Sequence, residues 1–410
     1  MNAEQFLQSI HFMPTAEELA QGGSDFRHAM HLGLLGQDGG LPMLPAYLPM
    51  KSACHAGEAL VLDAGGTNLR TAHVRMTSSG MEILEKRERP MPGTKGRLGA
   101  TEFFRQLAQD AAEMMTSAMP IGFCFSFTAD ILPDGDARVI YLDKELCVDG
   151  LVGRTVAQGL RDALKDLGAP APTVIRVMND AVAALLGASV GASDVDGCIG
   201  MILGTGFNCC YAEQNSRITK APTLSEQTGR SIVNIEAGAF AGMASTPADL
   251  LVRSRSIDPD QNLLEKMLSG AYQGPLLGAL LELAAEQDCF RQAPDLSHLS
   301  PTAADISAMV NGKHSPLEDA FAKEDVPVLH TFCHAIIQRA SALAAMVLKA
   351  IVAETGDVHA PILLSIEGST YWKNPLLQSL LADVLKDIPL QLVRTNEANL
   401  LGAAAAVMGA

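Results

Sequence analysis

The chain lacks the features that most quickly assign a protein to a class. No phosphate-binding loop of the form G-x-x-x-x-G-K-[ST] occurs, and the glycine-rich turns are not followed by the helix of a dinucleotide fingerprint. None of the eight cysteines belongs to a C-x-x-C pair, and most lie in apolar runs. We therefore expect free thiols in a reducing cytosol, and we do not expect a zinc site or a disulfide framework.

Positive charge is also scarce. Lys and Arg number 30 against 46 Asp and Glu, which gives a net charge of −16. This balance argues against nucleic acid or an anionic membrane surface as a partner. An anionic substrate would have to be held locally by backbone N–H groups, a metal ion and a few basic residues.

Sequence signals for membrane insertion are missing as well. The first residues, MNAEQFLQSIHFMPTAEEL, show no basic region followed by an apolar core. The most apolar helical stretch, 334–355, is interrupted by Gln338, Arg339 and Lys349, so no membrane span is predicted there. We expect a soluble, cytoplasmic protein without a membrane partner.

What the sequence does contain first points to two domains. Its 410 residues exceed the size of a single core, and the composition, 48% hydrophobic and 19% charged, is that of an ordinary globular protein. Helical periodicity is predicted over 100–117 and 153–167, and buried strands over 121–127 and 173–178.

The stretch Leu60–Arg70, LVLDAGGTNLR, predicts a buried strand, a tight glycine turn and a second strand. Glycine permits φ > 0 and lets the backbone approach a ligand closely. Successive N–H groups of such a turn bind anions, and Thr67 adds a hydroxyl donor. Asp63 is placed to hold a hydrated Mg²⁺, which prefers carboxylate and water ligands. The predicted phosphate-binding residues are Gly65, Gly66, Thr67 and Asn68, although an ordinary hairpin would have the same pattern.

A second turn of the same kind lies roughly 140 residues later, within 197–213. Gly204, Thr205 and Gly206 separate its two predicted strands, so we expect a duplicated fold with two phosphate-binding turns. Between the two turns, Asn179 and Asp180 come where a strand becomes an alanine-rich helix. An Asp at this place is most often a helix cap, but it is also suited to accept a proton from an alcohol.

Taken together, these motifs are similar to those of the hexokinase family of the actin-like ATPase superfamily, and the resemblance extends from about Phe26 to the C-terminus. It is carried by Asp63–Arg70, Phe123–Phe127, Met178–Val182, Gly204–Asn208, Asn234–Phe240, Glu265–Gly270 and Ile366–Tyr371. The resemblance implies an α/β fold of two ribonuclease H-like (actin-like ATPase) domains with an interdomain cleft. The small domain would comprise 58–180 with 396–410, and the large domain 1–57 with 181–395.

The resemblance also implies site residues. Asp180 would be the general base, and ATP with Mg²⁺ would bind between the two turns, passing Gly368 and Ser369. Sugar contacts would come from Ser126, Lys144, Asn179, Asn208 and Glu236. Without the resemblance, Ser126 reads equally well as a buried hydroxyl and Lys144 as a solvated surface lysine. Arg70 is either a charge near the phosphates or a strand ion pair.

Two departures from the family pattern concern the sugar. Pro275 stands where the family has a sugar-binding Glu, a loss for which Gln273 is a candidate substitute, and Ala237 replaces the usual aromatic residue. The expected function is ATP-dependent phosphorylation of the 6-hydroxyl of a hexose, glucose by default. The alternative is a sugar-binding sensor with weak catalysis. An actin-like or chaperone ATPase, or a repressor-type sugar kinase, fits less well, since the latter would carry a Cys-x-Cys-Gly motif. The sugar and the oligomeric state stay open.

Overall fold

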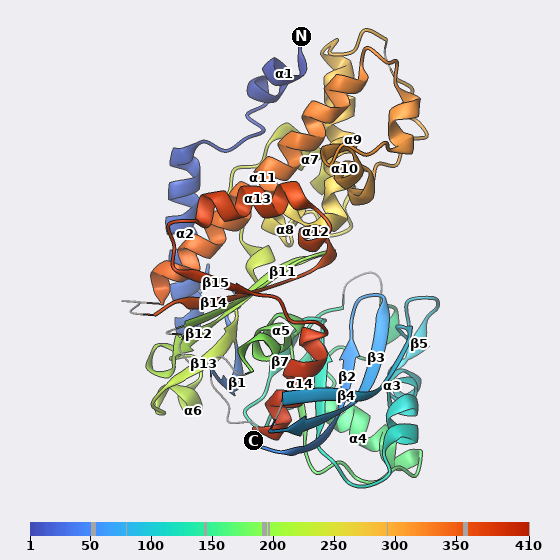
Figure 1. Ribbon diagram of the computed structural model, residues 1–410, viewed down its shortest axis with the longest axis vertical. Helices are drawn as coiled ribbons and strands as arrows, with labels where there is room; N and C mark the ends of the chain where they lie inside the picture. The colour runs from blue at the N-terminus through green and yellow to red at the C-terminus, as the bar shows by residue number, and fades with distance from the viewer. Residues whose placement is uncertain are drawn as a thin grey trace.

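A computed structural model describes residues 1–50, 55–78, 80–142, 146–190, 195, 197–292, 294–355 and 360–409. Its described part is organised by two large β-sheets, one across the middle of Figure 1 and one at its lower right. Helices lie between the two sheets and on their outer faces (Figure 1).

The first sheet has five strands in the order β10-β6-β2-β3-β4. Strands β2, β3 and β4 are successive antiparallel neighbours, whereas β2, β6 and β10 are parallel. The apolar run of β2 is buried on both faces, as expected for a central strand. The bounds are β2 (Gly57–Ala64), β3 (Asn68–Thr77), β4 (Gly80–Pro90), β6 (Ile121–Phe125) and β10 (Ile175–Met178).

The second sheet has six strands in the order β1-β13-β12-β11-β14-β15. Without β1, its order and strand directions repeat those of the first sheet: antiparallel β11, β12 and β13, then parallel β11, β14 and β15. The prediction of a duplicated, ribonuclease H-like fold is confirmed. The bounds are β1 (Leu44–Pro49), β11 (Gly197–Leu203), β12 (Phe207–Gln214), β13 (Arg230–Asn234), β14 (Ile362–Glu367) and β15 (Leu390–Val393).

Two small-residue helices, α5 (Asp180–Ser189) and α14 (Ala398–Met408), lie between the sheets (Figure 1). They pack very closely: a Cβ atom on Gly402 would lie 1.7 Å from the carbonyl oxygen of Ala183, and one on Gly187 would lie 2.2 Å from that of Ala398. Helix α14 contacts β2 and β6, whereas α5 contacts β11 and β14. This helix pair therefore joins the two sheets, and Asp180 stands at its edge.

The first sheet is covered on its outer face by α3 (Ala100–Met114) and α4 (Val156–Asp166), which bury Phe103, Phe104 and Leu107. Short strands complete this unit. They are β5 (Leu98–Gly99) with β9 (Val148–Asp149), and β7 (Ala129–Ile131) with β8 (Ala137–Val139).

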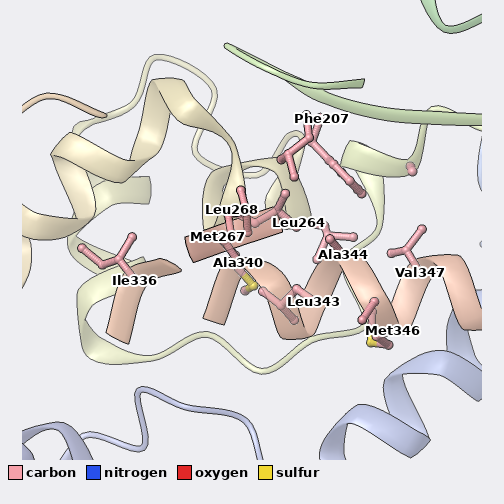
Figure 2. Close-up of a cluster of buried hydrophobic side chains, with 14 of the residues drawn as sticks. Phe207, Leu264, Met267, Leu268, Ile336, Ala340, Leu343, Ala344, Met346 and Val347 are labelled. Atoms are coloured by element: carbon pink, nitrogen blue, oxygen red, sulfur yellow. The ribbon is translucent and has the colours of Figure 1, made fainter. Parts of the chain in front are cut away.

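Most other helices belong to the larger unit around the second sheet. Figure 2 shows how α8 and α11 bury apolar side chains together with Phe207, the residue that follows the second glycine turn. The bounds are α1 (Ala3–Ser9), α2 (Ala16–Leu35), α6 (Pro222–Ser225), α7 (Pro247–Arg255), α8 (Leu263–Leu268), α9 (Gly270–Glu286), α10 (Ala303–Val310), α11 (Val326–Glu354), α12 (Ser369–Trp372) and α13 (Pro375–Leu385), with 3₁₀ turns at Asn215–Arg217, Ala237–Ala239 and Pro316–Ala320.

Helix α11 is long and apolar enough to cross a membrane by length and composition, so the charge-based argument against a span was wrong in its premise. However, 78% of its most apolar window is buried inside the protein. Arg339 is buried as well, and its two Nη atoms donate to the Asp249 carboxylate at 2.8 and 2.7 Å. The environment of α11 is thus that of a core helix.

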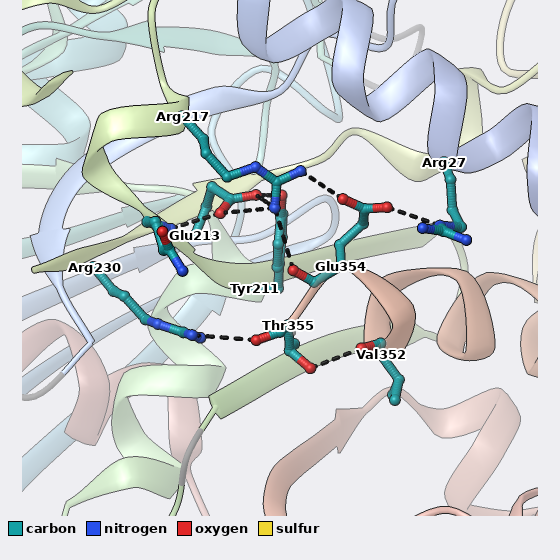
Figure 3. Close-up of polar contacts among 9 residues, drawn as sticks. Arg27, Tyr211, Glu213, Arg217, Arg230, Val352, Glu354 and Thr355 are labelled. Atoms are coloured by element: carbon teal, nitrogen blue, oxygen red, sulfur yellow. Dashed lines mark hydrogen bonds and ion pairs between the residues drawn. The ribbon is translucent and has the colours of Figure 1, made fainter. Parts of the chain in front are cut away.

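A polar network at the C-terminal end of α11 connects α11 with α2, β12 and the 3₁₀ turn Asn215–Arg217 (Figure 3). Arg217 donates to Glu354 at 2.6 Å, and Arg27 of α2 donates to the same carboxylate at 2.7 Å. The Tyr211 hydroxyl donates to Glu213 at 2.6 Å, and burial raises the pKa of the Glu213 carboxyl. This network lies apart from the described cavity between the sheets and supports the fold. The predicted domain boundaries stay a prediction.

Candidate functional site

A cavity of about 610 Å³ lies between the two sheet units, which is within the range of small-molecule sites. Both glycine turns and the start of α5 contribute to its walls. Most residues predicted from the sequence line it: Asp63, Gly65, Gly66, Thr67, Ser126, Asn179, Asp180, Gly204, Thr205, Gly206, Asn208, Glu236, Gly368 and Ser369. Asn68 is not part of the lining, and Lys144 lies outside the described residues.

The first turn is formed as predicted, by antiparallel β2 and β3. The carbonyl oxygen of Asn68 accepts from the Gly65 N–H at 3.0 Å and closes the turn, which gives Asn68 a structural part. The predicted positive φ is not adopted by Gly65, Gly204 or Gly206. These glycines lack a side chain so that neighbouring segments can approach their backbone closely, and not because the turn needs a positive φ.

The second turn shows this close approach. A Cβ atom on Gly204 would lie 3.2 Å from Gly368 Cα, and one on Gly206 would lie 2.8 Å from Glu265 Oε2. Glu265 Oε2 also accepts from the Phe207 N–H at 2.9 Å. The carbonyl of Gly204 accepts from the Thr370 hydroxyl at 2.8 Å. These contacts fix the turn against α8 and α12, with Gly204, Thr205 and Gly206 on the cavity wall.

Asp180 is the first residue of α5 and is half-buried in the cavity wall. Burial, together with repulsion from Asp63, raises the pKa of the Asp180 carboxyl to about 6. Hydrogen bonds from the Ala181 N–H, at 2.9 Å, and from the Ser126 hydroxyl oppose this rise. The carboxylate is ionised at neutral pH, and it is more basic than an exposed Asp. This combination suits a general base.

The helix-cap alternative for this segment applies to the neighbouring residue. Asn179 is the N-cap of α5, and its Oδ1 accepts from the Ala181 N–H at 2.8 Å. Because Asn179 caps the helix, the Asp180 carboxylate is not needed as the cap. The cap bond also fixes the orientation of the Asn179 side-chain amide.

Asn208 and Glu236 form another part of the wall, and Asn234 links their side chains by hydrogen bonds. Asn208 Nδ2 donates to Asn234 Oδ1 at 2.9 Å, and Asn234 Nδ2 donates to Glu236 Oε1 at 2.6 Å. Burial raises the pKa of Glu236 to about 7. Glu236 has φ 57°, a strained conformation for a residue with a side chain and one that is common at functional sites. Donors and acceptors fixed in this way suit a ligand with several hydroxyl groups.

The charge of the cavity favours a cation as part of the ligand. Among the described lining residues, six are carboxylic acids and two, Arg70 and Lys266, are basic. Arg70 forms ion pairs with Asp63 and, at 3.0 Å, with Glu397, which confirms the ion-pair reading. Arg70 also lines the cavity, and its part as a charge near the phosphates stays a prediction. Such a wall repels a polyphosphate unless a metal ion accompanies it.

Asp63 fits the part of a metal-binding carboxylate. It is buried, and burial raises its pKa against the opposing effect of Arg70. Its Oδ1 atom makes no hydrogen bond within the described protein and belongs to a residue of the cavity wall. The described residues contain no cluster of three or more His, Cys, Asp or Glu for a metal. One carboxylate with water and phosphate ligands matches Mg²⁺ chemistry without such a cluster.

The departures from the family pattern are resolved in part. Pro275 is exposed one helical turn after Ala271, a cavity residue. The Gln273 side chain is buried and donates to the Leu268 carbonyl at 3.4 Å, so it does not substitute for a missing cavity carboxylate. The sequence reasoning did not assign Tyr141, Asp258, Glu367 or Asn399, which also line the cavity. Glu367 lies within the Ile366–Tyr371 motif but was given no role, whereas Tyr141 and Asp258 lie outside the motifs.

Comparisons with known proteins agree with this geometry. Two family models, both described as Hexokinase, match residues 3–190 and 198–409. Hexokinase-2 of Rattus norvegicus is 27% identical over 98% of this chain, which spans 47% of the rat protein, about half its length. Hexokinase-3 of Oryza sativa is 28% identical over 88% of this chain and 79% of its own length. The structure of a hexokinase from Schistosoma mansoni complexed with glucose covers 100% of both chains with a TM-score of 0.84 at 22% identity, which supports the fold.

Proposed function

The chain belongs to the hexokinase family, and we propose that it transfers the γ-phosphoryl group of ATP to the 6-hydroxyl of a hexose, with glucose as the default substrate. The observation that carries this proposal is the position of Asp180. Its carboxylate, with the pKa raised to about 6, shares one cavity with two glycine turns and a set of fixed amides.

In this proposal the Asp180 carboxylate accepts the proton of the hexose hydroxyl as its oxygen attacks the γ-phosphorus. The oxygen–phosphorus bond forms while the bond to the ADP leaving group breaks. The Ser126 hydroxyl, which hydrogen-bonds Asp180, holds the carboxylate in place. Most of the rate enhancement would come from positioning and from electrostatic stabilisation.

The two turns would hold the phosphates from opposite sides. Backbone N–H groups near Gly65 and Gly66 and the Thr67 hydroxyl would contact them from one unit, and those at Gly204–Gly206 from the other. Gly368 and Ser369 would lie along the nucleotide, and Asn68 would support the first turn. Mg²⁺, held through water by Asp63, would neutralise charge on the phosphates.

The hexose would be held by Asn179, Asn208 and Glu236, and Ser126 and Lys144 are further predicted contacts. The loss of one charge-assisted acceptor at Pro275 should cost on the order of 1.5–3 kcal/mol for a sugar that needs it. Fructose, mannose and glucosamine are therefore tested alongside glucose. We also propose a cytoplasmic location and the domain boundaries 58–180 with 396–410 against 1–57 with 181–395.

The alternative of a sugar-binding sensor with weak catalysis is less favoured, because Asp180 and both turns are in place. A coupled assay for ADP release with the four hexoses separates the two functions. Turnover with at least one hexose supports the kinase. Sugar-induced thermal stabilisation without turnover supports the sensor. Pro275→Glu should improve glucose use, and Pro275→Ala is its matched control.

A further inference from the structure

A hydrogen bond crosses the mouth of the cavity between two segments that the proposed chemistry does not use. The Tyr141 hydroxyl donates to Asp258 Oδ2 at 2.8 Å. Tyr141 follows β8 of the first sheet unit, whereas Asp258 lies between α7 and α8 of the second. Both residues line the cavity. The contact therefore joins the two units at the cavity that contains the proposed hexose residues.

Tyr141 is fixed to its own unit by the backbone. The Ile140 and Tyr141 N–H groups donate to the carbonyl oxygen of Thr128 at 2.9 and 3.3 Å. Thr128 is two residues from Ser126, the residue that hydrogen-bonds Asp180. The Tyr141 ring is thus connected through a short path to the strand end that carries a predicted hexose contact.

Asp258 is held in a loop that two buried or half-buried cations make rigid. Lys266 Nζ donates to the Asp258 carbonyl at 2.8 Å and also to that of Gln261. Arg253 donates to the Pro259 carbonyl at 3.0 Å and to the Asp260 carboxylate at 2.9 Å. A loop fixed from inside its own unit presents Asp258 as a preorganised acceptor, which reduces the entropy lost when the contact forms.

The same loop is coupled to the second glycine turn. Glu265, next to Lys266 on α8, accepts from the Phe207 N–H at 2.9 Å. Phe207 directly follows Gly206. Helix α8 thus contacts both the Asp258 loop, through Lys266, and the turn proposed to bind phosphate, through Glu265.

Exposed apolar side chains flank the contact on both units. Ile140 is 48% exposed next to Tyr141, and Ile257 is 73% exposed next to Asp258. Closer approach of the two units would cover part of this apolar surface, which is favourable. The polar contact and its apolar neighbours thus favour the same motion.

We propose that Tyr141 and Asp258 form a latch, a pair of positioning residues that holds the two units together across the cavity mouth and retains the hexose. The expected effect of the latch on hexose binding rests on the proposed function. Its expected effect on the distance between the two units does not. Because a ligand binds with reduced apparent affinity when its competent state is less populated, loss of the latch raises the KM for hexose more than it lowers kcat.

The test compares Tyr141→Phe, Asp258→Ala and the double variant with the full-length wild type. Asp260→Ala is the matched control, because Asp260 lies in the same loop, is 84% exposed and pairs with Arg253 instead. We expect each single variant to raise the glucose KM about five-fold with kcat changed less than two-fold. The double variant should resemble either single one, because both remove the same bond.

Small-angle X-ray scattering without any ligand provides a readout that does not depend on activity. The latch variants should have a larger radius of gyration than the wild type and Asp260→Ala. Additive KM effects, an unchanged KM, or an unchanged radius of gyration in the double variant would each overturn the latch. If the wild type phosphorylates no hexose, the proposed function fails, and the scattering result still decides on the latch.

Discussion

Replacement of Asp180 by Asn tests two consequences of a carboxylate in this cavity wall, its use as a base and its cost to the stability of the fold. Asn has nearly the same shape, and its Oδ1 can still accept from the Ala181 N–H. It carries no negative charge and cannot act as a base. The variant should therefore lose turnover while the folded protein becomes more stable.

The magnitude of the stabilisation follows from the pKa. Burial, with repulsion from Asp63, raises the pKa of Asp180 from 3.8 to about 6. This corresponds to roughly 3 kcal/mol against the ionised form in the folded state. Since Asp180 is half-buried and partly screened by water, we expect Asp180→Asn to increase the free energy of unfolding by about 1–2 kcal/mol at pH 7.5. Turnover should fall roughly 10²–10⁴-fold, the usual contribution of a general base.

The sign of the pH dependence is fixed by the direction of the shift. Below the ordinary pKa of 3.8, Asp180 is protonated in both states and adds no penalty. As the pH rises towards 6, the unfolded chain loses this proton before the folded protein does, and the wild type loses stability relative to the variant. Urea unfolding at pH 4.5, 6 and 7.5 measures this difference, which should grow and then level off above about pH 7. The exposed Asp383, changed to Asn, is the control for loss of a carboxylate outside the cavity.

Two results would refute this reasoning. A stability difference that does not depend on pH, or a variant less stable than the wild type at pH 7.5, would show that desolvation does not govern this carboxylate. Near-normal turnover of Asp180→Asn would show that another group accepts the proton. Hexose binding, followed by thermal stabilisation, should be nearly unchanged in the variant.

Three further predictions concern the rest of the site. Because the pKa of Glu236 is raised to about 7, glucose kcat/KM should decline below pH 7 and more steeply below pH 6, and Glu236→Gln should remove the first decline in a pH–rate profile. Asp63→Asn should raise the Mg²⁺ concentration that gives half-maximal rate by about ten-fold, the usual loss for a weakened ligand set. A metal titration measures this value, and an unchanged value would exclude Asp63 from the metal site. Gly368→Ala should lower the free energy of unfolding, measured in urea, by about 2–4 kcal/mol, because φ is 119° and the added Cβ would lie 2.4 Å from Leu203. Gly57→Ala is the control and should be close to neutral, because its added Cβ meets open space.

The parts of the fold that the sequence predicts well are those with short-range signals. Both hairpins were recognised because an apolar run, a glycine turn and an alternating run follow one another within about 16 residues. The position of Asp180 was recognised because a strand ends and an alanine-rich helix begins at this place. Neighbouring residues carry this information, so no knowledge of the tertiary structure was needed.

The parts that the sequence does not predict are contacts between distant residues. Arg70 and Glu397 are 327 positions apart, Tyr141 and Asp258 are 117 apart. Neither pair has a periodic pattern, and nothing in the sequence near one member identifies the other. The core position of α11 was not predicted for a similar reason. Arg339 interrupts the apolar stretch in the sequence, and only the fold supplies Asp249, whose carboxylate accepts from both Nη atoms of Arg339. Predictions from spacing fail where the partner is supplied by the fold.

The electrostatics of Asp180, the proposed base, depend on both repeats and not on one alone. A carboxylate at a helix N-terminus is normally stabilised as the anion, which lowers its pKa. Here the pKa is raised, so burial and repulsion from Asp63 outweigh the helix. Asp63 comes from the first repeat, and α5, which carries Asp180, packs on β11 of the second. The basicity of Asp180 therefore depends on the distance between the two repeats, and a cation bound at Asp63 would weaken the repulsion and favour the ionised base.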